Sequence, residues 1–174
     1  MRSTSQDERD SQERARTLMT DAAAQFAASQ RPHELTNQEC QDRLASGTMG
    51  RVAWSAGGLQ HILPVSYAMH VGNVVFRTSP YGVLAQLKHR TNVAFEIDQV
   101  DRAAGTAWSV VVQGRAEAVV LPQELVALWA RSDIVPWAPG TRNVFIAIVP
   151  QIISGRTLQA PFASHGLTGQ ETHS

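Results

Sequence analysis

The stretch VVFRTSPYGVLAQLK, residues 74–88, changes from a strand pattern to a helix pattern within a few positions. Residues 74–78 combine β-branched and aromatic side chains, which predicts a strand. Ser79 then suits the N-cap of a helix and Pro80 its first position, and leucines follow at helical spacing within residues 83–88. We therefore predict a strand that runs directly into a helix.

This junction of strand and helix is a candidate anion site. Free backbone N–H groups at a helix start favour an anion such as phosphate. Arg77, Thr78 and Ser79 would bring a guanidinium and two hydroxyls to the same point. The N–H groups of Tyr81 and Gly82 would add donors, and Gly82 lets a ligand approach the backbone closely. The alternative is an ordinary capped helix with polar residues on its surface.

Composition narrows the class of protein. The chain has 174 residues and a formal net charge of zero, so we expect one domain and neither a nucleic-acid nor a membrane partner. Lys88 is the single lysine beside fourteen arginines, and it lies just past the candidate anion site. The one cysteine, Cys40, excludes an internal disulfide. We predict a core position for it rather than a nucleophilic role.

The two ends differ in composition from the middle of the chain. Residues 1–34 begin with a polar stretch that predicts a partly disordered arm, with a possible helix at 17–30. Residues 35–160 form the predicted domain, and residues 161–174 a flexible tail. No apolar run approaches the roughly 20 residues of a membrane helix, and no signal peptide is recognisable, so we expect a cytoplasmic protein.

The predicted domain is mainly β. A capping box at Thr36 starts a helix that ends at Gly47, and Pro122 opens another over residues 123–130. We predict strands at residues 51–55, 60–69, 74–78, 92–98, 108–121 and 143–149, and a short one at 155–158. Pro64 requires an edge, a bulge or an early end in its strand, and Gly114 predicts a bulge or barrel corner. The order predicts a six-stranded antiparallel barrel with flanking helices.

Metal and nucleotide motifs are absent from the sequence. There is no GxGxxG and no GxxxxGK[ST], and the six histidines are scattered without ligand spacing. We therefore predict no metal site.

Four segments resemble the pyridoxamine 5′-phosphate oxidase-like proteins, which are flavin-binding split β-barrels. They are residues 39–51, 61–67, 75–79, and 94–98 together with 108–117. The resemblance extends from about Leu35 to Arg156. It implies a homodimer with two flavins at the interface, each in contact with both chains, and an oxidoreductase that acts on a small molecule with FMN as cofactor.

The resemblance also implies cofactor-binding residues. The strand along the flavin ring would be Leu63, Pro64, Val65, Ser66 and Tyr67, which present backbone groups to the ring edge. The phosphate would be held by Arg77, Thr78, Ser79, Tyr81, Gly82 and Lys88. Trp108 and Ser109 would line the ring, and Trp137 and Arg142 would cover a substrate. No residue stands out as a general acid or base.

The sequence departs from the family at the phosphate site. Many members have a lysine or an arginine–lysine pair where this chain has Val83 and Leu84. The alternatives are therefore an F420-dependent reductase, a non-catalytic flavin or haem carrier, and a dimer with an empty cleft. Four tryptophans are many for a small barrel and suit an interface or a ring ligand, but for Trp54 and Trp129 we prefer core packing.

Overall fold

The computed structural model describes residues 14, 16–20, 32–136 and 139–159. Residues 16–20 are helical, and the rest of the predicted arm helix, the tail and Trp137 lie outside the described residues. The elements are β1 (His33–Glu34), α2 (Asn37–Ser46), β2 (Met49–Ala56), β3 (Leu59–His70), β4 (Asn73–Thr78), the 3₁₀ helix η1 (Val83–Lys88), β5 (Thr91–Asp101), β6 (Thr106–Ala118), α3 (Pro122–Trp129) and β7 (Val144–Gln159).

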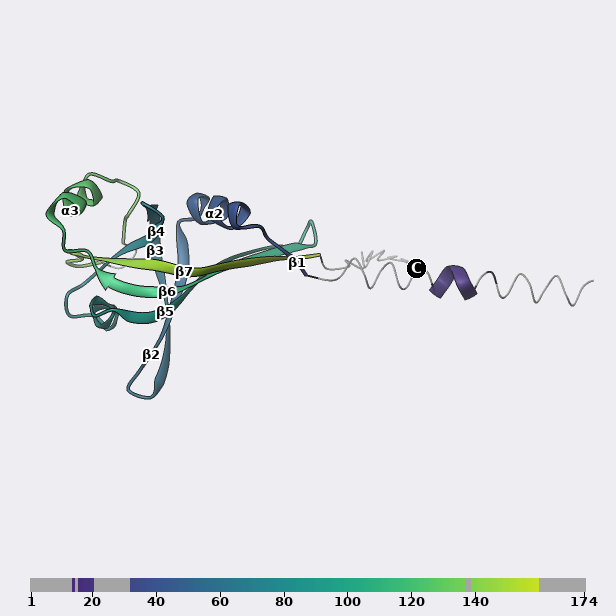
Figure 1. Cartoon of the computed structure of the whole chain (residues 1–174), viewed down its shortest axis with the longest axis horizontal. Helices are drawn as coiled ribbons and strands as arrows, with labels where there is room; N and C mark the ends of the chain where they lie inside the picture. The colour runs from purple at the N-terminus through teal and green to yellow at the C-terminus, as the bar shows by residue number, and fades with distance from the viewer. Residues whose placement is uncertain (1–13, 15, 21–31, 137–138, 160–174) are drawn as a thin grey trace, which may run out of the picture.

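Six of the seven described strands close into a barrel, as predicted (Figure 1). The sheet order is β1-β7-β4-β3-β2-β5-β6, and an additional pairing of β7 with β6 completes the ring. Every pairing is antiparallel. The two-residue β1 extends the sheet beside the far end of β7. The mainly β, six-stranded prediction is therefore confirmed.

The barrel is split between β3 and β4. The first part of β3, through Ser66, pairs only with β2, whereas Tyr67–His70 pair with Asn73–Phe76 of β4. The β2–β3 hairpin therefore projects away from the other strands (Figure 1). Pro64 lies in this part of β3 without ending the strand, which agrees with the predicted edge position because proline has no N–H to donate.

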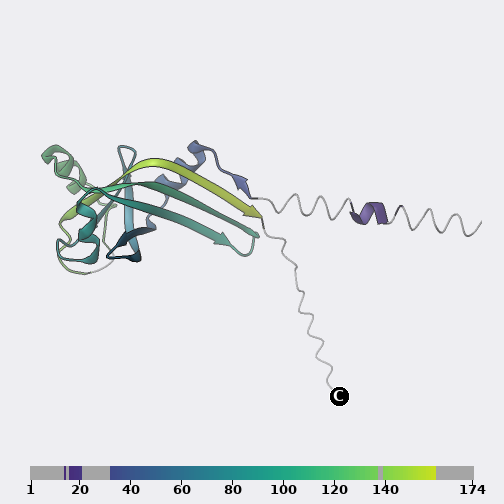
Figure 2. The ribbon, with the colours of Figure 1, turned by 60° about the horizontal axis from the view of Figure 1, so that its bottom comes forward.

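A bulge at Gly114 turns the long strands of the barrel. The register between β6 and β7 shifts between Gln113 and Gly114, as the glycine predicts. Opposite the shift, β7 continues through Pro150, so the two strands predicted for residues 143–158 are one strand of 16 residues. Beyond the bulge β5, β6 and β7 extend together as a curved arm (Figure 2).

The core has two parts on opposite faces of the sheet. Inside the barrel, Phe76, Phe95 and Ile148 pack with Leu44 of α2. Outside it, a smaller cluster forms where α3 and Ile134 cover the outer faces of β3, β4 and β7. α2 and α3 start as predicted. The capping box at Thr36 is formed with Glu39, and Pro122 lies in the first turn of α3.

Candidate functional site

A pocket of about 270 Å³ lies where β3, β4 and the residues after α3 meet. It is lined by Met49, Pro64, Val65, Arg77, Leu84, Pro136 and Arg142, and we call it the arginine pocket. Five of these side chains are apolar and two are cationic. A concave, largely apolar site with a few fixed charges is typical of small-molecule binding. The arginines favour an anionic group on such a ligand.

The pocket brings together only part of the predicted site. Pro64, Val65, Arg77 and Arg142 line it. Ser109 instead lines a separate cavity of about 560 Å³ between β1, β5, β6 and β7, which we call the Ser109 cavity. Trp108 is the neighbouring residue on β6. The guanidinium carbon of Arg43 lies 5.1 Å from the centroid of the Trp108 ring. Within one copy of the chain, the ring-lining residues predicted on β3 are therefore apart from those predicted on β6.

Arg77 has a fixed orientation at the pocket wall. Its Nε donates a 2.9 Å hydrogen bond to the carbonyl oxygen of Arg142. Its guanidinium carbon lies 4.3 Å from the ring centroid of Trp129 and 5.5 Å from that of Phe145. The two terminal nitrogens make no hydrogen bond to another residue in the described part of the chain. They remain as a pair of donors suited to a phosphate or carboxylate.

Arg77 and Thr78 do not converge as the sequence analysis predicted. Successive side chains of a strand point to opposite faces of the sheet. Val74 and Phe76 lie in the barrel core, Val75 in the outer cluster, and Arg77 on that same outer side. Thr78 is only 1% exposed, on the inner side. The hydroxyl of Thr78 is therefore separated from the guanidinium by the strand itself.

The predicted helix after Ser79 is also wrong in type and start. η1 is a six-residue 3₁₀ helix that begins at Val83, with Gly82 at its N-cap and no side-chain cap. Ser79 instead accepts a 3.3 Å bond from the N–H of Tyr81, which closes a local turn before the helix. Lys88 reaches back from the end of η1 and donates to the carbonyl oxygen of Pro80 at 3.5 Å.

This turn changes the proposed anion site. The N–H of Tyr81 is engaged with Ser79, and the Tyr81 side chain is 95% exposed. No α-helix begins at Ser79, so the expected row of free helical N–H groups is not formed there. Within the described residues, the anion-binding capacity near β4 rests mainly on the arginines. Leu84 lines the pocket and is 9% exposed.

The open edge of β3 is the second feature of the site. The Tyr67 N–H donates to the carbonyl oxygen of Thr48, on the side of β2. Because this direction alternates along a strand, Ser66, Pro64 and Ile62 direct their backbone groups to the opposite side. No described strand pairs with that side before Tyr67. Backbone donors and acceptors beside the arginine pocket are thus available to a ligand, except at Pro64, which offers only its carbonyl.

Tyr67 itself is a core residue. Its side chain is 1% exposed, packs edge-to-face on Phe95 at 4.9 Å, and donates a 2.8 Å hydrogen bond to the carbonyl oxygen of Leu44. Gly47 leaves room for this phenol, since a Cβ there would lie 2.3 Å from its oxygen. The phenol of Tyr67 therefore joins β3 to α2 and does not face the arginine pocket.

Burial raises the pKa of Tyr67 to about 12, and this predicts a loss of stability in alkali. An unfolded tyrosine ionises near its ordinary pKa of 10.0. Between the two values the unfolded chain has released the proton that the folded chain retains, so stability falls as the pH rises. The total loss should approach about 2.7 kcal/mol. Denaturant unfolding from neutral pH to about pH 11 should show about half of this loss, roughly 1.4 kcal/mol, because pH 11 lies midway between the two pKa values.

A matched pair of variants isolates the contribution of Tyr67 to this alkaline transition. Tyr67→Phe should lower stability near neutral pH by about 1–3 kcal/mol, because a buried carbonyl loses its donor. It should also remove most of the decrease in unfolding free energy between neutral pH and about pH 11. Tyr81→Phe, at the exposed tyrosine, should retain that decrease. An equal decrease in wild type and Tyr67→Phe would contradict the assignment.

Four residues at the site were not among the predicted ones. Met49, Leu84 and Pro136 line the arginine pocket, and Trp129 stacks on Arg77. Trp129 is 49% exposed, which corrects its predicted core role, whereas Trp54 is 3% exposed as predicted. Only the family's cation position gave a signal, since it drew attention to Leu84. The other three come from β2, from α3 and from the segment after α3, and local sequence patterns do not show that these parts lie beside β4.

Metal-binding clusters and membrane-spanning helices are both absent from the described residues. No group of three or more His, Cys, Asp or Glu side chains there could hold a metal ion. No helix in the described ranges is long and apolar enough to cross a membrane.

The chain is similar to one protein family, to curated relatives and to several solved structures. The family model described as pyridoxamine 5′-phosphate oxidase matches residues 36–157. An uncharacterized protein of Mycobacterium tuberculosis, Rv0080, is 34% identical over 127 residues, which cover 70% of this chain and 82% of that protein.

Several solved structures are similar to this chain, including two with TM-scores above 0.6. A proposed pyridoxamine 5′-phosphate oxidase of Corynebacterium glutamicum is 31% identical, with a TM-score of 0.66, over 75% of this chain and 96% of the other. A protein of Mycobacterium smegmatis described as FAD-binding is 28% identical, with a TM-score of 0.62, over 72% of this chain and 98% of the other.

Proposed function

Because the chain belongs to the pyridoxamine 5′-phosphate oxidase family, we propose that it binds a flavin nucleotide at the arginine pocket and is an oxidoreductase acting on a small molecule. The observation that carries the proposal is the oriented guanidinium of Arg77 beside the open edge of β3. A flavin nucleotide needs both features, since it combines an anionic phosphate with a ring edge of hydrogen-bonding atoms.

The residues present fit parts of such a cofactor. Arg77 and Arg142 suit the phosphate, and the backbone groups of Ser66 and Pro64 suit the ring edge. Met49 and Val65 offer apolar contact to a flat ring. A bound flavin would supply electron or hydride transfer, while these residues bind and orient it. The similarity to an FAD-binding protein of Mycobacterium smegmatis supports a flavin, with FMN and FAD both open.

We further propose that two copies of the chain share each flavin. The arginine pocket, at about 270 Å³, is just below the usual range of about 300–1,000 Å³ for ligand sites. Ser109 and Trp108, predicted to line the ring, lie away from it in the same copy. A second copy that brings its Ser109 cavity to the arginine pocket would unite the two groups.

Sedimentation tests the shared site. A homodimer of this kind should bury more than about 2,000 Å² in total and persist at micromolar concentration. Ser109→Trp, which places a large ring in the Ser109 cavity, should weaken flavin binding if that cavity belongs to the shared site. A protein that sediments only as a monomer while binding flavin at full affinity would exclude sharing.

Ligand titration tests the proposed function itself. FMN and FAD should bind about tenfold to a hundredfold more tightly than riboflavin, because riboflavin has no phosphate for the arginines. Flavin fluorescence measures each affinity, and mass spectrometry identifies any molecule released when the purified protein is denatured. Binding of F420 in preference to FMN and FAD would favour the deazaflavin reductase. Failure to bind any of these ligands would overturn the proposal.

Turnover separates an enzyme from a carrier. In a reductase, NADPH supplied alone should reduce the bound flavin by hydride transfer, and a small-molecule acceptor added afterwards should take the electrons and reoxidise it. A flavin that stays unchanged in both steps would favour the non-catalytic carrier.

A further inference from the structure

We propose that Trp129 and Arg131 are positioning residues of the flavin site, which together hold the guanidinium of Arg77 in the orientation that binds phosphate. This inference rests on the proposed function and adds to it residues outside the pocket lining. Neither side chain lines the arginine pocket. Both lie on α3 or just after it, a segment that the sequence alone did not connect with the site.

The guanidinium of Arg77 is held by a ring on one side and by a carbonyl oxygen at Nε. One face of its guanidinium lies over Trp129, at 4.3 Å, and its Nε donates to the Arg142 carbonyl. An arginine side chain has many rotamers, and fixing one of them opposes binding unless the protein has already done so. Stacking on an indole restricts the guanidinium plane and leaves the edge with the two terminal nitrogens for a ligand.

Trp129 is placed for this contact and not for filling the core. It retains 49% exposure, whereas Trp54 retains 3%. Its ring meets the buried Phe145 edge-to-face, with centroids 5.0 Å apart and an interplanar angle of 85°. Phe145 is 1% exposed on β7 and so gives the indole a rigid support. The exposed area of Trp129 shows that burial alone does not account for its position.

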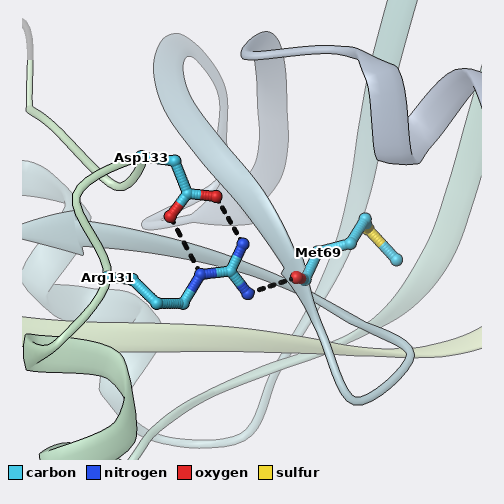
Figure 3. A network of polar contacts seen from close by, with 3 residues as sticks. All are labelled: Met69, Arg131 and Asp133. Atoms are coloured by element: carbon cyan, nitrogen blue, oxygen red, sulfur yellow. Dashed lines mark hydrogen bonds and ion pairs between the residues drawn. The ribbon is translucent and has the colours of Figure 1, made fainter.

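Arg131 fixes the end of α3 that carries Trp129. Its Nη1 donates a 2.7 Å hydrogen bond to the carbonyl oxygen of Met69, and its Nε donates a 2.9 Å bond to Asp133 (Figure 3). A second contact from Nη2 makes the pair with Asp133 bidentate. The guanidinium of Arg131 lowers the pKa of Asp133, so the carboxylate stays charged. Met69 belongs to β3, so Arg131 attaches this end of α3 to the strand that also carries Pro64 and Val65.

The contacts form one continuous chain. β3 holds Arg131 through Met69, α3 carries Trp129 two residues earlier, and Trp129 orients Arg77 on β4. Ile134 is 2% exposed and packs with Leu128 in the outer cluster, so the same segment is also held by apolar contacts. The wall of the pocket that bears the charge and the wall formed by β3 are therefore tied to each other through α3.

The test compares four variants in two measurements. Trp129→Leu removes the stacking ring, Trp129→Phe keeps a smaller one, and Arg131→Gln removes the attachment to Met69. Arg90→Gln is the control, because it breaks an exposed ion pair with Glu117, at 3.0 Å, away from the arginine pocket. Melting temperatures verify that each variant is folded.

The first measurement is the NMR signal of the Arg77 Nε–H in the ligand-free protein, assigned by its loss in Arg77→Lys. Ring stacking and the bond to Arg142 should shift this signal and slow its exchange with water. We expect the shift and the slow exchange to disappear in Trp129→Leu and to weaken in Arg131→Gln. Both should persist in Trp129→Phe and Arg90→Gln.

The second measurement is the ratio of the dissociation constants of riboflavin and FMN. It should fall roughly threefold to tenfold in Trp129→Leu and Arg131→Gln, recover in Trp129→Phe, and stay constant in Arg90→Gln. A merely structural role would weaken both ligands alike and leave the ratio unchanged. If the wild type prefers FMN and the ratio is the same in Trp129→Leu, the positioning role is wrong but the proposed function stands. If the wild type binds neither ligand, the proposed function fails and the positioning role falls with it.

Discussion

Replacing Arg77 with alanine is expected to weaken FMN binding about tenfold to a hundredfold, since a hydrogen bond to a charged group contributes roughly 1.5–3 kcal/mol. The guanidinium is already oriented by Trp129 and by the Arg142 carbonyl, so a phosphate meets a donor pair that needs little reordering. Riboflavin affinity should stay at its wild-type value, because the lost contact is to the phosphate. Fluorescence titration with both ligands gives the two dissociation constants.

The matched control for Arg77 is another arginine on a strand. Arg115→Ala removes the same charge from β6, where the side chain is exposed and lines a different cavity. It should bind FMN as the wild type does. Arg77→Lys, which keeps the charge but not the planar fork, should lie between wild type and Arg77→Ala. If Arg77→Ala bound FMN at full affinity, the phosphate would have to lie elsewhere on the chain.

Among the substitutions considered for their effect on unfolding free energy, Gly114→Ala should be the most destabilising. A Cβ at this position would lie 2.2 Å from the carbonyl oxygen of Val149 and 3.2 Å from the Cα of Pro150. Both are backbone atoms of the bulge that closes the barrel, so no side-chain rotation can relieve the overlap. We expect a loss of about 3 kcal/mol in unfolding free energy. In a domain of this size that lowers the melting temperature by about 6–12 °C.

Gly82→Ala serves as the control for Gly114→Ala. Gly82 has an ordinary φ of −78°, and a Cβ there would meet nothing closer than the Ser79 Cβ at 3.7 Å. Its unfolding free energy should stay within about 1 kcal/mol of wild type. A Gly114→Ala protein as stable as Gly82→Ala would mean that the bulge can move to admit a methyl group.

The parts of the fold that could be predicted have local chemical causes. The capping box at Thr36 is formed by groups three residues apart, and Pro64 and Gly114 mark an edge and a bulge through their own backbone chemistry. These signals do not depend on what packs nearby. The family resemblance then supplied the order of the strands, which local patterns cannot.

The sequence-based predictions of the site were wrong where one side chain could bond to either of two partners, or where segments distant in sequence meet. The Ser79 hydroxyl could cap a helix or close a turn on Tyr81, and only the turn is formed. Arg77 and Thr78 were expected to converge, although the alternation of a strand, readable from sequence, already separates them. The exposed position of Trp129 could not be predicted, because it depends on Arg77, which is far away in the sequence.

The position of β7 in the ring has a consequence for synthesis of the chain. β7 pairs with both β4 and β6, yet it follows them by many residues. While the ribosome is still making residues 144–159, the completed strands β4 and β6 each lack a neighbour, and the nascent barrel is an open sheet with two unpaired edges. Pairing between segments so distant is slow, and open edges invite contact with other chains. We therefore expect nascent chains that end before β7 to need chaperone protection, a demand that ends when the last strand closes the ring.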